Sequence, residues 1–325
     1  MHYLSGLPTS FMIVLLANGQ LQAQITDNLA TDPGEARFVY EDVQNFLRAH
    51  EMLSSTADTV AILQAEYFER GTPGLNLFVE KYDLTPERLA KAIREHPEDY
   101  AALGDRLAWL RAEEQVNREA FTELKGHLPT VVYPPTYYLV GAWRGIGSGS
   151  VEGQLITIEK KASAGPKHDM RTLLVHELVH FQQGMAIGYE KYIALFGPEK
   201  SLLGLTIREG TAEFFADLVT GQFTQEEARE YVMSHEGELW QRFQGEMNGS
   251  ETGDWMWQQP SDPEQPPHVA YVLGARIVKS YYDSGADRER AVNEILSVTD
   301  YESFLDRSGY ANRFSGEGYK ASKVK

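Results

Sequence analysis

Apolar residues recur at spacings of three and four through most of the first half of the chain. This period is typical of amphipathic helices whose apolar stripe faces a core. It predicts helices over 36–53, 56–70, 85–95 and 98–124. Thr85 and Pro86 support the third helix, because a threonine N-cap followed by proline is a favourable helix start. The part from 24 to 129 is therefore predicted to be a helical N-terminal region.

The pattern changes after residue 130. The segments 131–133 (VVY) and 136–142 (TYYLVGA) are β-branched and aromatic, and 154–159 (QLITIE) alternates, so short strands are predicted there. The glycine-rich stretch 143–153 predicts a flexible hairpin or lid. Helical periodicity returns at 169–184, 199–220, 224–246, 267–283 and 287–297. The expected fold is α+β and mostly helical, with a small sheet packed on a helix pair in a domain spanning 130–325.

The N-terminus carries the short apolar run Phe11–Ala17, followed by Leu21-Gln22-Ala23. This run is far below the roughly 20 residues that span a bilayer, and the small residue after it resembles a cleavage site. Residues 1–23 are predicted to be a signal peptide, although the first residues offer His2 and no Lys or Arg. The alternative is an irregular or packed segment. The expected location is periplasmic or extracellular in a bacterium, with no stable membrane span after cleavage.

Charge and composition exclude several classes of function. The formal net charge is −17, from 30 basic and 47 acidic residues. A field of this sign repels nucleic acid and anionic lipid surfaces, so no nucleic-acid partner is expected. The chain has no cysteine, which excludes disulfides, zinc–thiolate sites and thiol nucleophiles. A bound metal must therefore be held by nitrogen and oxygen ligands.

One segment, 171–183 (RTLLVHELVHFQQ), places His176, Glu177 and His180 among aliphatic residues. Residues four apart share a helix face, so the two imidazoles can reach one zinc ion at about 2.0–2.1 Å. Glu177 can reach a water on that metal and act as general base, as in the pattern His-Glu-x-x-His. The alternative is two core histidines bonded to backbone groups. The apolar flanks favour a metal, because unpaired buried imidazole and carboxylate groups are costly.

A third ligand is expected on the next helix, 201–221 (SLLGLTIREGTAEFFADLVTG). Glu209 lies there on an otherwise apolar element and is the predicted zinc ligand. Glu213, one turn later on the same face, is predicted to accept the outer N–H of a ligating histidine. Asp217, one more turn along, is the weaker candidate for that role. The alternative places Glu209 at the surface.

These two motifs together resemble the gluzincin metallopeptidases, zinc enzymes with His-Glu-x-x-His on one helix and a glutamate ligand on the next. The resemblance implies zinc binding and peptidase activity, with Glu209 and Glu213 in the ligand and orienting places. The nearest likeness is to a poorly characterised bacterial family of predicted zinc proteases related to a gliding-motility lipoprotein. It covers roughly 130–310, including 271–282 (YVLGARIVKSYY) and 300–305 (DYESFL). Lipoprotein relatives need an N-terminal cysteine, so membrane anchoring is not implied here.

The resemblance also implies a Tyr or His from a later helix that stabilises the oxyanion of the tetrahedral intermediate. His268 and Tyr271 lie three apart after a proline-rich loop, and either could face the metal. Tyr271 is preferred because the likeness includes a tyrosine in this helix. The alternative is a core tyrosine packed beside Leu273 and Ile277.

Gluzincins bind the substrate backbone by strand addition to an edge strand that precedes the zinc helix. The strand in that place contains Gln154, Leu155, Ile156 and Thr157, which are predicted to bind substrate. Trp255 and Trp257, in a long polar loop, are predicted to attach that loop to the body of the protein; the alternative is that they line a rim of the cleft.

The predicted function is hydrolysis of peptide bonds in a peptide or protein substrate by a water activated on one Zn²⁺ ion. The alternative is an exported, non-catalytic binding or assembly factor on a peptidase scaffold, with structural zinc. The presence of Glu177 favours the enzyme, because a retired site often loses its base first. Hydrolysis of a non-peptide amide is left open.

Overall fold

A computed structural model describes residues 29–53, 58–164, 170–197 and 200–314. The predicted signal peptide lies outside these residues and stays a prediction, as does export. Within the described part, the chain is mostly helical and carries one small sheet, which confirms the expected α+β class.

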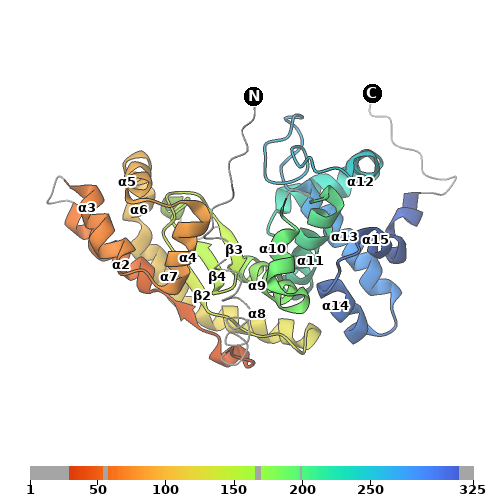
Figure 1. The fold of residues 1–325 in the computed structure, drawn as a ribbon, viewed down its shortest axis with the longest axis horizontal. Coiled ribbons are helices and arrows are strands. Elements are labelled where there is room, and N and C mark those ends of the chain that lie inside the picture. Colours follow the sequence, from red (N-terminus) through yellow and green to blue (C-terminus); the bar gives the residue numbers. More distant parts are fainter. Residues whose placement is uncertain (1–28, 54–57, 165–169, 198–199, 315–325) are drawn as a thin grey trace, which may run out of the picture.

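The helices between residues 41 and 112 gather at one end of the molecule, on the left in Figure 1, and the helix that follows them runs along the bottom of the view towards the centre. Two of them begin at a threonine N-cap followed by proline: the Thr72 hydroxyl accepts from Leu75 N, and the Thr85 hydroxyl accepts from Arg88 N. The elements of this part are η1 (Pro33–Glu35), α2 (Glu41–Leu53), α3 (Thr59–Leu63), the π-helical turn η2 (Gln64–Phe68), α4 (Pro73–Tyr82), α5 (Pro86–Glu95), α6 (Pro97–Ala101), α7 (Leu103–Ala112) and α8 (Glu114–His127).

Two predictions for this part were inaccurate. The single helix expected over 98–124 is three helices, separated at Ala102 and Glu113. Helix α4 was not predicted at all. The helix expected over 36–53 begins only at Glu41, because the backbone at 38–39 forms a short strand that pairs with residues 136–137.

The sheet has the order β1-β2-β4-β3, with β1 (Phe38–Val39), β2 (Thr136–Leu139), β3 (Gly147–Ser150) and β4 (Gly153–Thr157). Strands β1, β2 and β4 are parallel, whereas β3 pairs antiparallel with β4. Strands β2 and β4 are therefore central, and β1 and β3 form the edges.

Helices cover both faces of the sheet. A Cβ on Gly74 of α4 would lie 2.3 Å from the ring of Tyr137, so α4 packs closely on that side chain. On the other face, the Gln154 amide donates to the Leu174 carbonyl of the motif helix, the helix that carries His176 and His180. Tyr137 is adjacent in β2 to Thr136, the register partner of Gln154. Because successive side chains point to opposite faces, the sheet lies between α4 and the motif helix.

The second half adds the 3₁₀ turns η3 (Ala162–Ala164) and η4 (Tyr310–Phe314), and the helices α9 (Met170–Ile187), α10 (Tyr189–Ala194), α11 (Leu202–Thr220), α12 (Glu226–Glu246), α13 (Val269–Ser284), α14 (Arg288–Leu296) and α15 (Tyr301–Ser308). Helices α11 and α13 cross at two glycines. A Cβ on Gly274 would lie 1.9 Å from the Thr206 carbonyl oxygen, and one on Gly210 would lie 2.1 Å from the Gly274 backbone. This contact fixes α13 against the helix that carries Glu209.

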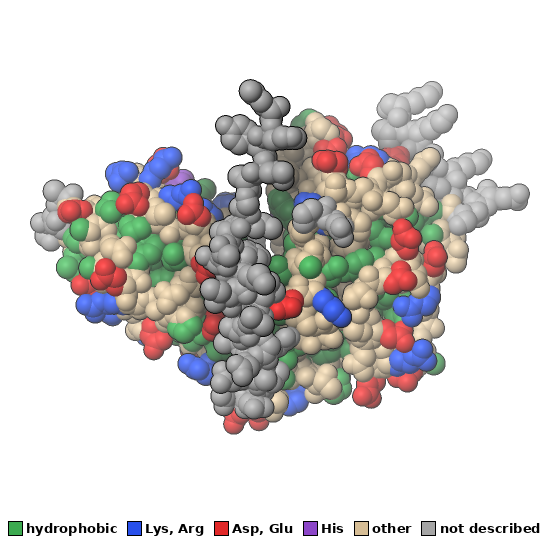
Figure 2. Space-filling model, in the orientation of Figure 1, with side chains coloured by type: hydrophobic (Ala, Val, Ile, Leu, Met, Phe, Trp, Pro, Cys, Tyr) green, Lys and Arg blue, Asp and Glu red, His purple; other side chains and the backbone are tan. Residues whose placement is uncertain are grey.

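Among the described helices, none combines the length and apolarity that crossing a bilayer requires. On the face shown in Figure 2, acidic side chains are spread over the left and the right part of the molecule, with Lys and Arg side chains between them. The negative charge is therefore distributed on this face rather than gathered in one patch.

Candidate metal centre

Helix α9 carries the histidine motif through the middle of the molecule. It contacts β3 and β4 on one side and α8, α10 and α11 on others. These contacts bury His176, Glu177 and His180 together with their aliphatic neighbours. Three titratable side chains are thereby removed from water, and each needs a partner.

The two histidines and Glu209 bring three ligand atoms to one point. Nε2 of His180 lies 3.1 Å from Nε2 of His176 and 3.1 Å from Oε2 of Glu209. Nε2 of His176 lies 3.5 Å from the same carboxylate oxygen. Ligands about 2.0–2.1 Å from a tetrahedral zinc ion are separated by roughly 3.3 Å, so this donor set fits such an ion. The buried group His176–His180–Glu209 can hold a metal ion, and the alternative with an exposed Glu209 is wrong.

The same groups alter one another's pKa. Burial would raise the pKa of Glu209, but the charges and hydrogen bonds of His180 and His176 lower it well below its usual value. Burial would lower the pKa of His176, but the carboxylates of Glu209 and Glu213, which accept from the protonated ring, raise it well above its usual value. The carboxylate is therefore kept ionised, as a metal ligand must be.

The second ring nitrogen of each histidine lies close to a side-chain oxygen. Nδ1 of His176 lies 3.2 Å from Oε1 of Glu213. The Glu213 carboxylate is held by the backbone N–H and the hydroxyl of Thr224. Glu213 is thus placed where its predicted orienting role requires. Asp217, the other candidate, lies at the more open end of α11, and the described part of the chain includes no hydrogen bond from it to either histidine.

The partner of His180 was not predicted from the sequence. Its Nδ1 lies 2.9 Å from Oε1 of Gln183, whose amide nitrogen donates to the Arg208 carbonyl at 3.1 Å. Gln183 therefore joins α9 to α11 behind the metal ligands. A signal was present in the sequence, because residues three apart on a helix share a face.

The Glu177 carboxylate lies against β3. A Cβ on Gly147 would lie 2.4 Å from Oε1 of Glu177, and one on Gly149 would lie 3.1 Å from Cβ of His180. The glycines of this strand are thus required by its close approach to α9. Burial raises the pKa of Glu177, while the neighbouring His176 and His180 lower it, and the pKa stays above its usual value. A raised pKa brings a carboxylate closer to the range in which it exchanges protons at neutral pH.

Tyr271 lies directly beside the ligands. Its ring stacks on that of His176, with centroids 6.0 Å apart and planes 9° from parallel. Burial, followed by the charges of Glu209 and Glu177, raises the pKa of Tyr271 well above its usual value, so the hydroxyl stays protonated and can donate.

His268 lies at the N-cap of α13, with a φ of 68°, and its ring meets Tyr271 edge-on at 5.1 Å. Its Nδ1 is buried and has no hydrogen-bond partner among the residues that the structure describes. Burial lowers the pKa of His268, which favours the neutral ring. Both residues face the same cavity, and Tyr271 is the one in contact with a metal ligand.

The predicted substrate-binding strand is wrong. Gln154, Leu155, Ile156 and Thr157 belong to β4, which is paired with β2 on one side and β3 on the other. Its backbone is therefore occupied, and the Gln154 side chain is bonded to the Thr136 hydroxyl and to α9. The sequence showed strand propensity but not strand order.

The open edge next to the metal centre belongs to β3. Thr157 N donates to the Ile146 carbonyl, so the residues Ile146 and Thr157 form a hydrogen-bonded pair of the β3–β4 ladder. Pairs alternate along an antiparallel ladder, so Ser148 and Ser150 bond to β4 while the backbone groups of Gly147 and Gly149 point outward. The Gly149 carbonyl accepts a bond from the Tyr189 hydroxyl at 3.4 Å.

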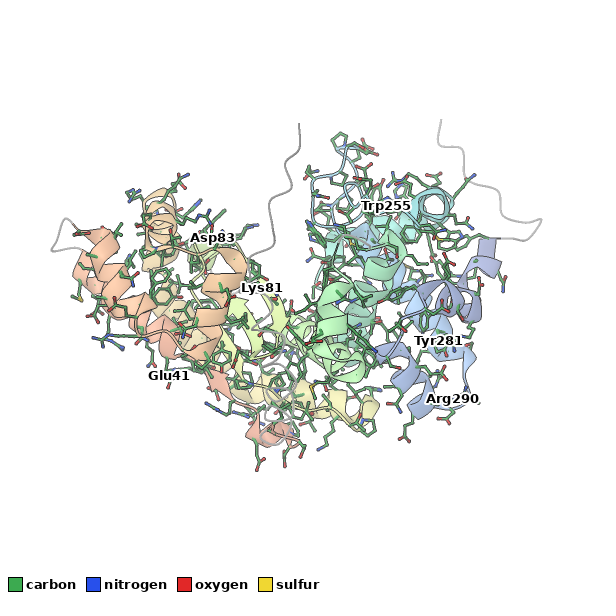
Figure 3. The ribbon with its side chains drawn as sticks, in the orientation of Figure 1. Glu41, Lys81, Asp83, Trp255, Tyr281 and Arg290 are labelled. Carbon is green, nitrogen blue, oxygen red and sulfur yellow. The ribbon has the colours of Figure 1, made fainter. Side chains whose placement is uncertain are left out.

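A cavity of about 1100 Å³ opens over these groups. Its walls include β3 and its flanks, the candidate metal ligands with Glu177, helix α10 with Phe196, and helix α4. The start of α13, the 224–225 segment and Trp257 complete the lining. Lys81 of α4 donates to the Ser148 hydroxyl at 2.6 Å and is labelled in Figure 3 beside the sheet. The N-terminal helices thus contribute to the cavity through an element that was not predicted.

The two loop tryptophans have different environments. Trp255 is buried, and its Nε1 donates to Glu246 at 2.7 Å, so it attaches the loop as expected. Trp257 is 48% exposed and lines the cavity, so the same expectation was wrong for Trp257.

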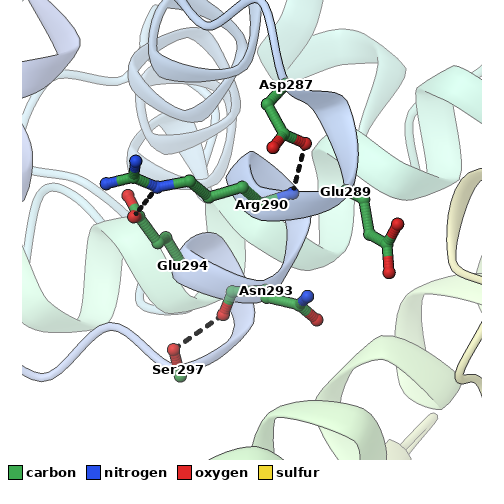
Figure 4. A pocket seen from close by; sticks show the side chains of 6 residues that line it. All are labelled: Asp287, Glu289, Arg290, Asn293, Glu294 and Ser297. Atoms are coloured by element: carbon green, nitrogen blue, oxygen red, sulfur yellow. Dashed lines mark hydrogen bonds and ion pairs between the residues drawn. The ribbon is translucent and has the colours of Figure 1, made fainter.

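A separate hollow of about 340 Å³ lies on α14 (Figure 4). Its polar groups bond to one another: Asp287 caps Arg290 N, and Arg290 pairs with Glu294.

A second possible metal group, His96–Glu98–Asp99, is less buried, and the Asp99 oxygens already accept bonds from Trp143 and Ser163. Neither feature competes with the buried centre on α9 and α11.

No protein-family model, no curated protein and no solved structure matches this chain.

Proposed function

We propose that this protein is a zinc-dependent peptidase of the gluzincin type. The observation that carries the proposal is the convergence of His176, His180 and Glu209 at tetrahedral spacing beside a buried Glu177, all facing one large cavity. Nitrogen and oxygen donors with these spacings suit zinc, and three protein ligands leave a fourth position for water, as catalytic zinc sites do.

When bound, a zinc ion lowers the pKa of a water molecule to about 7 and polarises a carbonyl group. The chain supplies the rest of the chemistry. Glu177 accepts a proton from the attacking water and passes it to the leaving amine. The Tyr271 hydroxyl donates a hydrogen bond to the oxygen that becomes negative as the carbonyl is attacked. Glu213 and Gln183 hold the two imidazoles in the tautomer that leaves Nε2 free.

The free edge of β3 favours a peptide as substrate. An extended peptide can pair with the outward N–H and C=O groups of Gly147 and with the N–H of Gly149, beside Glu177 and His180. Such pairing would place the carbonyl of the peptide next to the metal centre. An amide without a peptide backbone would lack these bonds.

The decisive variant is Glu177→Gln, which keeps the shape of the side chain and removes the base. We expect it to retain bound zinc and to lose peptide cleavage by about 10²-fold or more. The measurements are metal analysis and cleavage of a peptide library, with and without a chelator. Glu227→Gln, at an exposed position on α12, controls for the loss of one carboxylate.

Two outcomes would contradict the proposal. Cleavage that survives in the Glu177→Gln variant would remove the base from the mechanism. Peptide binding in the wild-type chain without any cleavage would instead favour the non-catalytic binding factor with structural zinc.

A further inference from the structure

Arg208 is an unpaired charge inside the protein. It lies on α11 immediately before the ligand Glu209 and is 2% exposed. None of its three guanidinium nitrogens makes a hydrogen bond to any residue that the structure describes. An arginine stays protonated in proteins, and a buried charge without a partner is strongly unfavourable. Its donors therefore lack an acceptor among the residues that the structure describes.

Two aromatic rings cover the faces of this guanidinium. Its central carbon lies 3.9 Å from the ring centroid of Tyr192 and 3.9 Å from that of Phe196. Stacking of this kind offsets part of the desolvation through the ring electrons. It leaves the N–H groups directed outward in the plane between the rings, which is the geometry that binds a carboxylate through two parallel hydrogen bonds.

A second unpaired donor lies in the same region. The Tyr301 hydroxyl is buried and has no hydrogen-bond partner in the described part of the chain. The Tyr301 ring packs on Gly204, which lies one helical turn before Arg208. A Cβ on Gly204 would lie 3.0 Å from this ring. Burial raises the pKa of Tyr301 to about 12, and the charge of Arg208 opposes this rise. Two donors without acceptors in one region indicate a place for an anion.

This place adjoins the metal centre. Tyr192 and Phe196 both line the cavity, and the Tyr192 ring lies 6.4 Å from the ring of His180. Phe196 is 41% exposed and its ring separates the guanidinium from the cavity, so a ligand that reaches Arg208 from the cavity has to displace this ring. The carboxylates of Glu80, Glu190 and Glu177 also line the cavity. They repel a doubly charged anion more strongly than a singly charged one, so a carboxylate suits this place better than a dianion.

We infer that Arg208, with the Tyr301 hydroxyl, binds a carboxylate group of the substrate between Tyr192 and Phe196. This inference rests on the proposed peptidase function and names a substrate class for it: peptides that present a carboxylate on the His180 side of the scissile bond. The carboxylate is either the C-terminus of the peptide or the side chain of an Asp or Glu residue.

The test uses the full-length Glu177→Gln protein loaded with zinc, which binds peptides without cleaving them. Four versions of one short peptide are compared by calorimetry: a free C-terminus against a C-terminal amide, and an internal Glu against Gln. We expect the version with the recognised carboxylate to bind about 10- to 100-fold more tightly than its neutral counterpart. The pair that differs identifies the source of the carboxylate.

In the Glu177→Gln protein, the added change Arg208→Gln should bring the affinity ratio between charged and neutral peptide close to one. Arg208→Lys should keep part of this ratio. Arg229→Gln, a more exposed arginine on α12, is the matched control and should keep the full ratio. If Arg208→Gln does not fold, Tyr301→Phe removes only the hydroxyl, and a ratio lowered by about 3- to 10-fold is expected. Zinc content is measured for each variant because Arg208 adjoins a ligand.

The outcomes separate the two proposals. Equal binding within both peptide pairs, or a ratio unchanged in Arg208→Gln, overturns the carboxylate site. If wild-type protein cleaves the peptides but prefers neither charged version, the peptidase stands and the site fails. If the Glu177→Gln protein prefers a charged version but the wild type cleaves none, the site stands and the peptidase fails. A chain that neither binds nor cleaves any of the four overturns both.

Discussion

At the residue scale, the residues of the candidate metal centre could be picked out from local sequence features. His176 and His180 share a helix face by their spacing alone, and Glu209 was recognisable as an acid on an apolar helix. The partner of His180 depends on how α9 and α11 face each other. Gln183 reaches both His180 and the Arg208 carbonyl, and the sequence cannot show the second of these contacts.

This geometry predicts the effect of removing the Gln183 amide. The change Gln183→Ala leaves Nδ1 of His180 without its partner, so the ring loses its fixed orientation. We expect zinc affinity to fall by about 10- to 100-fold, as measured by competition with a chromogenic chelator. Gln182→Ala is the matched control, because Gln182 bonds the Val132 backbone instead of a ligand. Equal zinc affinities in the two variants would remove Gln183 from the metal centre.

At the element scale, strand order was the feature that the sequence could not show. QLITIE has high β propensity, which favours an edge strand there, whereas GSGS has low propensity and forms the edge that lies over the candidate metal centre. Only glycine permits this strand, since a Cβ at Gly147 would meet Glu177. β propensity describes how well a residue suits an average strand. In β3 the close approach to α9 determines which residues fit, and it requires glycine.

The crossing of α11 and α13 provides a second prediction at this scale. Gly274→Ala would place a methyl group 1.9 Å from the Thr206 carbonyl oxygen, so the helices must separate. We expect the free energy of unfolding to fall by about 1–3 kcal/mol, which exceeds the gain of roughly 1 kcal/mol from the better helix propensity of alanine. Cleavage should fall as well, because α13 carries Tyr271 one turn earlier.

The control for this change is Gly245→Ala on α12, where a Cβ would meet nothing within 4 Å. That variant should be unchanged or slightly more stable by helix propensity alone. Urea denaturation of both variants provides the comparison. A stable Gly274→Ala protein with normal activity would show that the two helices do not need their close contact.

At the scale of the whole molecule, the N-terminal helices had no predicted role. They carry no chemical motif, and the helix that reaches the cavity, α4, was not predicted from periodicity. Its position depends on packing: Gly74 fits against Tyr137, and Lys81 then reaches Ser148 on the edge strand. Such contacts join residues far apart in the chain, so they appear only once the sheet and its two covering layers are assembled.

The attachment of α4 to α2 makes stability depend on pH. Asp42 of α2 is fully buried, and its carboxylate accepts bonds from the backbone N–H and hydroxyl of Thr72, the N-cap of α4. Burial raises the pKa of Asp42 to about 6, although the bonds from Thr72 oppose the rise. In the unfolded chain this carboxyl group has a pKa near 3.9. Between these two values the folded protein therefore binds more protons than the unfolded chain.

It follows that the contribution of Asp42 to the free energy of unfolding falls as pH rises from about 4 to about 6, by up to roughly 3 kcal/mol. Asp42→Asn keeps the shape and an acceptor oxygen but cannot ionise, so its unfolding free energy should lose this part of the slope. Asp105→Asn, at an exposed position on α7, should follow the wild-type slope. Urea denaturation at several pH values between 4 and 7 measures all three proteins. Parallel curves for wild type and Asp42→Asn would mean that the Asp42 carboxylate ionises as readily in the folded protein as in the unfolded chain, because Thr72 then compensates its burial fully.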